Sequence, residues 1–382
     1  MRIFEVIESS SNSSVSSLAW YRNLYEPLID MGHEVILFPA EEGRRAMQKQ
    51  DVEIKARFSQ NLLDKFHQEH SRKPLNLFFS YLMDGMVDVG VIDEVRKTGV
   101  PTCNFSCNNT HQFDLVHDIS LHFDFNLHSE KEAARKFYDI GANPIWFPMA
   151  ANPRYYHPYE TVKKIDVSFV GQCYARRPYY IWFLLENGID VHVFGPGWKQ
   201  KNDQLFLRQI IRTIRRLNLL IKLLLVSSSG KRYQFAAQLM DMDLRNHLSR
   251  KYKSHFHGII SDEQMVKNYS ESKISLGFLE VYDGHNPALK VQQHIHLREF
   301  EAPMSGAFYL TGYTKELAEF YEPDKEIVIY HSEHEMLEKI RYYLTHPDQA
   351  EKIRQAGYIR ARRDHTYQRR FETLFQNLNL EL

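Results

Sequence analysis

The chain has 382 residues, and its 48 basic and 48 acidic side chains give a formal net charge of zero. This length exceeds one ordinary core and indicates two domains. A balanced charge gives no overall positive field, so a nucleic-acid partner is not expected. The 22 Tyr and 24 Phe exclude a disordered or fibrous chain.

The cysteine content indicates a reducing compartment. Only Cys103, Cys107 and Cys173 occur, without the paired spacing of a zinc site. The first residues, MRIFEVIE, begin a strand and lack the apolar core of a signal peptide. No apolar run reaches the ~20 residues of a membrane-spanning helix. We therefore expect a cytoplasmic protein that neither crosses a membrane nor is exported by a visible signal.

The first half of the chain alternates strands with helices. The strand RIFEVIE is followed by a polar loop at 9–17, a helical pattern in LAWYRNLYEPLIDMG and a second strand, HEVILFP. The alternation continues to PIWFPMA and ends near Pro153 and Pro158, which interrupt regular structure. This pattern is typical of a parallel sheet covered on both faces and predicts an α/β domain at 1–158.

The second half repeats the scheme. IDVSFVG, YYIWFLLENG and DVHVFG predict a strand, a helix and a strand, and further strands follow at KISLGFLE, AFYLT and EIVIY. We expect a second α/β domain at 159–362, interrupted near 204–240 by a basic insertion. The charged, helical end at 363–382 is expected to pack back on the first domain.

Four motifs in the second half occur in order: DVSFVGQCYARRPY, HGIISDEQMVKNYSESKISLGF, HLREFEAPMSGAFYLT and GYIRARRDHTYQRRFETL. Together they resemble the CgeB-like (spore-maturation type) glycosyltransferases of the GT-B fold, and the resemblance extends more weakly into the first half. It implies two doubly wound Rossmann-like domains facing across a cleft. The C-terminal domain would bind a nucleotide-diphosphate sugar, and the N-terminal domain would bind the acceptor.

The resemblance gives Glu301 the leading role. In related sugar transferases a glutamate at this point of the motif accepts hydrogen bonds from the ribose hydroxyls, and a carboxylate can accept two vicinal hydroxyls at once. Arg298, one helical turn earlier, would meet a phosphate or fix the Glu301 carboxylate. The alternative is a structural salt bridge. Gly306, in the small-residue turn after Glu301, joins the predicted nucleotide site.

The expected stereochemistry stays open. Where retaining relatives carry the pattern E-x7-E, this chain has Gln293 eight residues before Glu301. An inverting enzyme needs a general base for the acceptor hydroxyl, and His111 or Asp114, after a strand of the first domain, would serve. A retaining enzyme needs no such base.

The loop after IDVSFV carries the second set of candidates. Gly171 would let the backbone approach a ligand, and Arg176 and Arg177 follow before a helix. An arginine at this point can neutralise a leaving diphosphate, so neither a metal nor any cofactor besides the donor is expected. The alternative is an exposed turn with solvated arginines.

Two loops complete the predicted site. The loop at 283–290 faces the donor sugar in the resembling family, which makes His285, Asn286 and Lys290 candidates for contacts to sugar hydroxyls or diphosphate. The serine-rich loop at 9–17 is analogous in place to the acceptor loop of GT-B enzymes, and its small side chains keep backbone N–H groups accessible.

The segment 204–240 has seven basic residues and no acidic one. On a helix, one side carries Arg208, Arg212, Arg215, Arg216 and Lys222. The opposite side carries Leu207, Ile210, Ile211, Ile214, Leu217 and Ile221. Such a helix can lie on an anionic membrane through 207–223, on the inner face, or pack on the second domain or a partner subunit.

These features predict a metal-independent glycosyltransferase of hexosyltransferase type. Uridine diphosphate is the expected carrier by resemblance, and the acceptor would be a glycan, a lipid-linked molecule or a protein. Two other functions stay open: a nucleotide-sugar epimerase, and a non-catalytic GT-B scaffold that uses the basic helix for partner or membrane contact.

Overall fold

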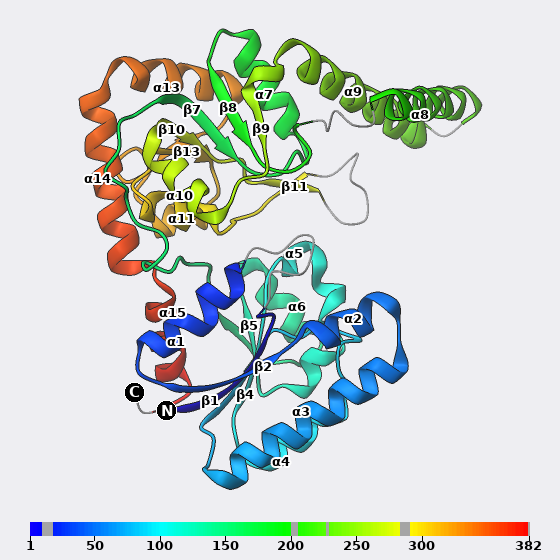
Figure 1. Cartoon of the computed structure of the whole chain (residues 1–382), viewed down its shortest axis with the longest axis vertical. Coiled ribbons are helices and arrows are strands. Elements are labelled where there is room, and N and C mark those ends of the chain that lie inside the picture. Colours follow the sequence, from blue (N-terminus) through cyan, green and yellow to red (C-terminus); the bar gives the residue numbers. More distant parts are fainter. Residues whose placement is uncertain (10–17, 200–204, 227–228, 283–290, 381–382) are drawn as a thin grey trace. The chain divides into compact units, whose positions relative to one another are not determined.

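The computed structural model describes residues 1–9, 18–199, 205–226, 229–282 and 291–380. The chain divides into two compact units, one formed by 1–155 with 362–382 and the other by 156–361. Sequence analysis places the corresponding boundaries at 158 and 362. Figure 1 labels the elements of both units.

Unit 1 is built on a six-stranded parallel sheet in the order β2-β1-β3-β4-β5-β6. Its strands are β1 (Arg2–Ile7), β2 (Glu34–Pro39), β3 (Leu77–Ser80), β4 (Thr102–Ser106), β5 (Phe125–His128) and β6 (Pro144–Trp146). Every residue of β1 is buried, as expected for a central strand covered on both faces.

Helices and short helical turns connect these strands. They are η1 (Tyr21–Tyr25), α1 (Glu26–Asp30), α2 (Glu41–Lys49), α3 (Val52–Arg72), α4 (Val89–Lys97), α5 (Asn109–Gln112), η2 (Phe113–Leu115), η3 (Ile119–His122), η4 (Lys131–Ala133), α6 (Ala134–Asp139) and α15 (Tyr367–Asn377). The last of these, α15, packs on α1. Arg370 of α15 donates to the carbonyl oxygens of Pro148 and Met149 at 3.1 Å each, so the C-terminal helix is part of unit 1.

Unit 2 has its own six-stranded parallel sheet, in the order β14-β13-β10-β7-β8-β9. The strands are β7 (Ile165–Val170), β8 (Val191–Phe194), β9 (Phe256–Gly258), β10 (Ser272–Leu276), β13 (Tyr309–Gly312) and β14 (Val328–Tyr330), with a separate antiparallel pair, β11 (Glu280–Tyr282) and β12 (Val291–Gln293). Counted within the unit, this is the strand order of a Rossmann fold, which reverses between β7 and β10.

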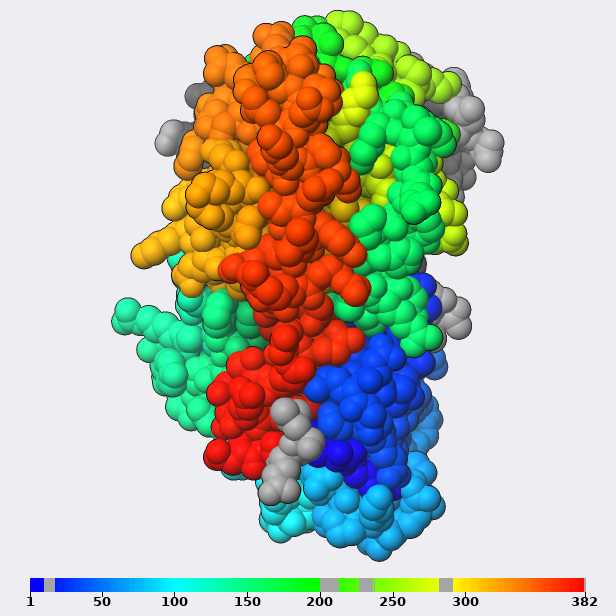
Figure 2. All heavy atoms as spheres, turned by 90° about the vertical axis from the view of Figure 1, so that its left-hand side faces the viewer, coloured from blue at the N-terminus to red at the C-terminus, as the bar shows by residue number. Residues whose placement is uncertain are grey.

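The helical elements of unit 2 are α7 (Arg177–Glu186), α8 (Leu205–Leu225), α9 (Ser229–Lys251), η6 (Lys253–His255), α10 (Asp262–Glu271), α11 (Arg298–Met304), α12 (Leu317–Phe320), α13 (Glu333–Thr345) and α14 (Pro347–Asp364). Apolar side chains of α7, α9 and α13 form one core with the sheet, which includes Ile181, Leu248 and Ile340. Figure 2 shows α13 and α14, in orange, along the surface of this unit.

The insertion forms two helices. α8 and α9 pack against each other, and α9 also contacts α7. In Figure 1 the pair extends away from the sheet of unit 2. None of the helices within the described ranges has both the length and the apolar character needed to span a bilayer.

Candidate nucleotide site

The motif HLREFEAPMSG forms a loop and then the short helix α11. The helix ends at Met304, and Gly306, two residues later, has a φ of +71°, in the left-handed region that favours glycine. A Cβ at Gly306 would lie 2.9 Å from Cγ of Pro158. Gly306 is therefore explained by the backbone turn and by this close contact, while the predicted contact to nucleotide stays a prediction.

The two carboxylates of α11 have different surroundings. Glu299 is fully engaged, because Oε1 accepts a hydrogen bond from the Tyr309 hydroxyl at 2.7 Å and Oε2 accepts one from the backbone N–H of His296 at 2.6 Å. Glu301 accepts through Oε1 from the Tyr156 hydroxyl at 2.7 Å, and among the described residues its Oε2 has no hydrogen-bond partner. Of these two carboxylates, Glu301 is therefore the one that keeps an oxygen for a ligand.

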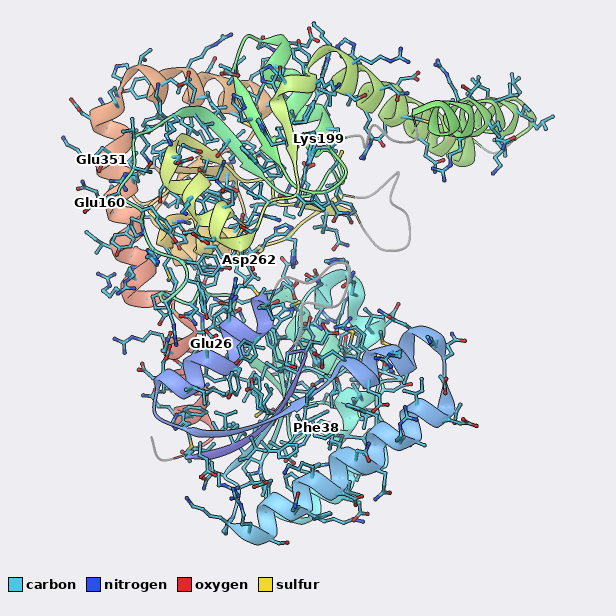
Figure 3. The ribbon with its side chains drawn as sticks, in the orientation of Figure 1. Glu26, Phe38, Glu160, Lys199, Asp262 and Glu351 are labelled. Atoms are coloured by element: carbon cyan, nitrogen blue, oxygen red, sulfur yellow. The ribbon has the colours of Figure 1, made fainter. Side chains whose placement is uncertain are left out.

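Burial controls the protonation of Glu301, which is 5% exposed. Burial raises its pKa from 4.5 to about 7, against the opposing effects of the Tyr156 hydrogen bond and the Arg298 charge. Asp262, labelled in Figure 3 at the start of α10, adds to the increase. A bound donor for the free oxygen would favour the ionised form.

Arg177 lies at the switch point of the sheet, at the first position of α7. It is 4% exposed. Its guanidinium donates to the carbonyl oxygens of Gln172 and Phe278 at 3.4 Å each, and Nη2 lies 3.3 Å from Nε2 of His296. Burial and then the charge of Arg298 lower the pKa of Arg177 to about 10. The cation is thus incompletely compensated.

Arg298 adds a second guanidinium beside Arg177 and His296, and these three side chains form a cluster. Within the described residues it forms no ion pair with Glu299 or Glu301, so the structural salt bridge is not the arrangement observed. The Nε atoms of Arg177 and Arg298 and Nδ1 of His296 are buried and have no hydrogen-bond partner in the part of the chain that the structure describes. Burial, with His294 and both arginines, lowers the pKa of His296 well below its usual value. These groups form a partly buried positive site with unused donors, which suits an anion.

A cavity of about 220 Å³ lies beside this cluster, at the carboxyl ends of the strands of unit 2. Its lining consists of Arg176, Tyr180, Phe278, Leu279, Glu280, Gln293, Gly312, Tyr313, Tyr330, His331, Ser332 and Glu333. Ligands of open α/β sheets bind at this edge.

Arg176 belongs to the cavity rather than to the partly buried cluster. It is 48% exposed and lies 3.6 Å from the Glu280 carboxylate. Glu280 accepts from the Tyr180 hydroxyl at 2.6 Å, and its other oxygen is buried without a hydrogen-bond partner among the described residues. The two consecutive arginines therefore have different surroundings, which the sequence RRP does not reveal.

Gly171 has a packing explanation. A Cβ there would lie 2.6 Å from Cζ of Phe169. Its N–H donates to the carbonyl oxygen of Phe194 at 2.8 Å, and its own carbonyl oxygen accepts from the Trp198 indole at 2.7 Å. Both backbone groups are thus engaged, and the predicted ligand contact of Gly171 stays a prediction.

The two residues predicted as general bases for the acceptor hydroxyl lie in unit 1. His111 is half-buried in α5, with Nδ1 3.4 Å from the Thr110 hydroxyl, and Asp114 is exposed in η2. The structure brings together Arg177, Arg298 and Glu301 but gives no test of His111 and Asp114. His285, Asn286 and Lys290 lie outside the described residues, as does nearly all of the loop 9–17.

Residues 177–376 match a family described as glycosyl transferase-like. The match covers more than half of the chain. The chain belongs to this glycosyl transferase-like family. A CgeB-like specificity within it stays a prediction. A comparison with curated proteins finds no match.

Several solved structures share the fold of this chain at low sequence identity. Sucrose-phosphate synthase from Thermosynechococcus elongatus matches with a TM-score of 0.59 and 10% identity over 99% of both chains. AviGT4, a glycosyltransferase involved in avilamycin A biosynthesis, matches with a TM-score of 0.55 and 12% sequence identity, over 99% of this chain and 97% of the AviGT4 chain. Anabaena Alr3699/HepE in complex with UDP matches with a TM-score of 0.55 and 9% sequence identity, over 99% of this chain and 100% of the HepE chain. The GT-B fold class predicted from the sequence is confirmed.

Proposed function

We propose that this family member transfers a sugar from a nucleotide-diphosphate sugar, with uridine diphosphate as the carrier, to a glycan, a lipid-linked molecule or a protein. The observation that carries the proposal is the pairing of Glu301, which has a free carboxylate oxygen, with the partly buried Arg177–Arg298 cluster. One side of such a site suits a ribose hydroxyl and the other a diphosphate. The solved HepE structures contain UDP and UDP-glucose, which supports this choice of carrier.

Glu301 would accept a hydrogen bond from a ribose hydroxyl through Oε2, while Tyr156 holds Oε1. In this arrangement Tyr156 is a positioning residue, because it touches the carboxylate and not the ribose. Its hydroxyl sets the direction of the free oxygen, and a fixed acceptor loses little rotational freedom when it binds.

The two arginines would bind the diphosphate and stabilise the charge that develops on it as the sugar departs. Guanidinium groups suit phosphate oxygens geometrically. This supports a transfer that needs no metal ion and no cofactor besides the donor. Arg176, in the neighbouring cavity, would contact the end of the diphosphate nearer to the sugar.

The cavity is the proposed place of the donor sugar. At about 30 Å³ per water molecule, its volume corresponds to about seven waters, enough for a single sugar ring. Glu280, Gln293, Ser332 and Glu333 line it with groups that can pair with hydroxyls. His285, Asn286 and Lys290 remain proposed contacts to the same part of the donor.

Unit 1 is the proposed acceptor domain. His111 or Asp114 would act as the general base if the reaction inverts the sugar configuration, whereas a retaining reaction would not use them. Gln293 at the position of the first glutamate of E-x7-E leaves both outcomes open.

A donor screen followed by turnover tests the function. Thermal-shift assays with UDP, GDP, ADP and dTDP and their sugars would identify the donor, and mass spectrometry of reactions with candidate acceptors would detect the glycosylated product. We expect stabilisation by one uridine diphosphate sugar and loss of this stabilisation in Arg177→Ala. Isomerised donor without a glycosylated acceptor would favour an epimerase, and no binding of any nucleotide would favour a scaffold.

We also propose that α8 attaches the enzyme to the inner face of an anionic membrane. Six large apolar residues of α8 are between 40% and 80% exposed: Ile214, Leu217, Leu220, Ile221, Leu224 and Leu225. α8 packs on α9 of the same unit, but these six side chains stay exposed, so this contact leaves much of the described apolar face open to a further partner. Exposure on this scale indicates a contact surface.

Charge favours a membrane over a protein partner. α8 has no acidic residue, and a basic groove of about 520 Å³ lies at the end of α9, lined by Lys199, Arg250, Lys251 and Lys253, among others. Lys199 is labelled in Figure 3. Apolar side chains flanked by cations suit acyl chains beneath anionic headgroups. The three free thiols support a cytoplasmic position.

Vesicle flotation tests the membrane contact. We expect the protein to float with vesicles containing phosphatidylglycerol but not with pure phosphatidylcholine, and Leu217→Asp with Leu224→Asp to abolish flotation. Ile359→Asp is the matched control, because Ile359 is 60% exposed on α14. Equal flotation of both variants, or a concentration-dependent dimer that only the α8 variant loses, would contradict the proposal.

A further inference from the structure

Four side chains of types that can ligate metals gather at the amino ends of β8 and β9. Asp190 precedes β8 and His192 lies in it, while His255 precedes β9 and His257 lies in it. The two strands are parallel neighbours. The proposed nucleotide site lies at the opposite, carboxyl ends of the strands, so the two sites are separate.

The alternation of strand side chains explains this gathering. Val191, Val193 and Phe256 point into the core of unit 2. Residues between or beside them face the other way, which places His192, His255 and His257 together on the outer face. His192 and His255 are partly buried and His257 is exposed, so all three are accessible to an ion.

The separations of the ligand atoms fit a tetrahedral ion. Oδ1 of Asp190 lies 3.4 Å from Nε2 of His192 and 3.2 Å from Nδ1 of His255. One ligand atom from each of the three residues lies within 4.8 Å of the others. Zinc bonds of about 2.0–2.1 Å place tetrahedral ligand atoms about 3.3 Å apart, so two of the three separations already match.

His257 supports the ligand role of His192. Nδ1 of His192 lies 2.8 Å from Nε2 of His257, and the two rings stack at 5.0 Å. When Nδ1 of His192 donates this hydrogen bond to His257, Nε2 of His192 carries the lone pair and can bind an ion on the side of Asp190. Histidine ligands of metals are commonly fixed by such a bond at the other nitrogen.

We propose that Asp190, His192 and His255 bind one divalent transition-metal ion of the zinc type, with His257 as the hydrogen-bond partner of His192. Imidazole nitrogens suit such ions, and zinc also binds carboxylate oxygens. The ion would join β8 to the η6–β9 segment that follows α9, and it would thereby fix the end of the α8–α9 insertion. This role does not depend on the transferase function.

A metal titration tests the site. Untagged full-length protein, treated with EDTA and desalted, is titrated with Co²⁺ and followed by visible absorption. We expect one Co²⁺ equivalent, displaced by Zn²⁺. His192→Ala and His255→Ala should each weaken binding at least tenfold, and Asp190→Asn should act similarly without changing circular dichroism.

The matched control is His117→Ala. His117 is also an exposed histidine beside an aspartate, with Nδ1 2.7 Å from Asp118, but within the described ranges these two residues are not part of a group of three potential metal ligands. We expect this variant to bind Co²⁺ as the wild type does. No saturable equivalent, or the same affinity in the His192 and His255 variants as in the wild type, would overturn the proposal. UDP binding measured on the same samples should not depend on the metal, so failure of this site and failure of the nucleotide site are distinguishable.

Discussion

Replacing Glu301 by glutamine is expected to stabilise the protein at alkaline pH. The folded pKa of Glu301 is raised from 4.5 to about 7 by burial. Between these values the folded state holds a proton that the unfolded state releases, so the free energy of unfolding falls as pH rises through this window. A shift of this size corresponds to about 3 kcal/mol at pH 8. Glutamine keeps the shape and an acceptor for the Tyr156 hydroxyl but does not ionise.

Urea unfolding at pH 5, 6, 7 and 8, followed by fluorescence, measures this effect. The advantage of Glu301→Gln over wild type should be smallest at pH 5 and grow toward about 3 kcal/mol at pH 8. Glu263→Gln is the control, because its exposed carboxylate pairs with Lys267 at 2.7 Å and has a lowered pKa. Its difference from wild type should have the opposite sign. A pH-independent difference for Glu301→Gln would refute the reasoning.

Three further predictions concern the same unit. UDP affinity of the wild type should fall as pH drops from 8 to 6, because protonated Glu301 loses an acceptor, and isothermal titration of Glu301→Gln should show a flatter profile. Arg177→Ala should weaken UDP binding by about tenfold or more, from the loss of a charge-assisted contact of about 1.5–3 kcal/mol, while leaving uridine binding unchanged in the same titration. Gly171→Ala should lower the free energy of unfolding by about 1–3 kcal/mol in urea, because the added methyl would lie 2.6 Å from Phe169; no change would show that the Phe169 ring moves freely.

The fold class was accessible from the sequence because buried parallel strands leave a strong apolar signal. β7 and β10 both appear as short apolar runs bounded by turns, and the restart at IDVSFVG marks unit 2. The sequence analysis predicts no element at 41–72, where the structure has α2 and α3. Phe58, Leu62 and Phe66 are buried and recur at helical spacing, so the signal for α3 was present.

The candidate site was accessible only in outline. Sequence motifs single out Glu301 and Arg298, but they do not reveal that Tyr156, 145 residues away, holds one oxygen of Glu301. They also do not separate Glu299 from Glu301. On a helix these two side chains point about 200° apart, and only the surrounding partners show that Glu299 is fully engaged.

The central claim is that the carboxylate of Glu301 contacts the ribose of the donor nucleotide. Affinities of wild type and Glu301→Ala for UDP and for 2′,3′-dideoxy-UDP test it most directly, because the four values form a double-mutant-type cycle. The account predicts that removing the hydroxyls weakens wild-type binding by about tenfold or more and has little further effect in Glu301→Ala. Equal losses in both proteins would show that the hydroxyls do not contact this carboxylate and would contradict the account.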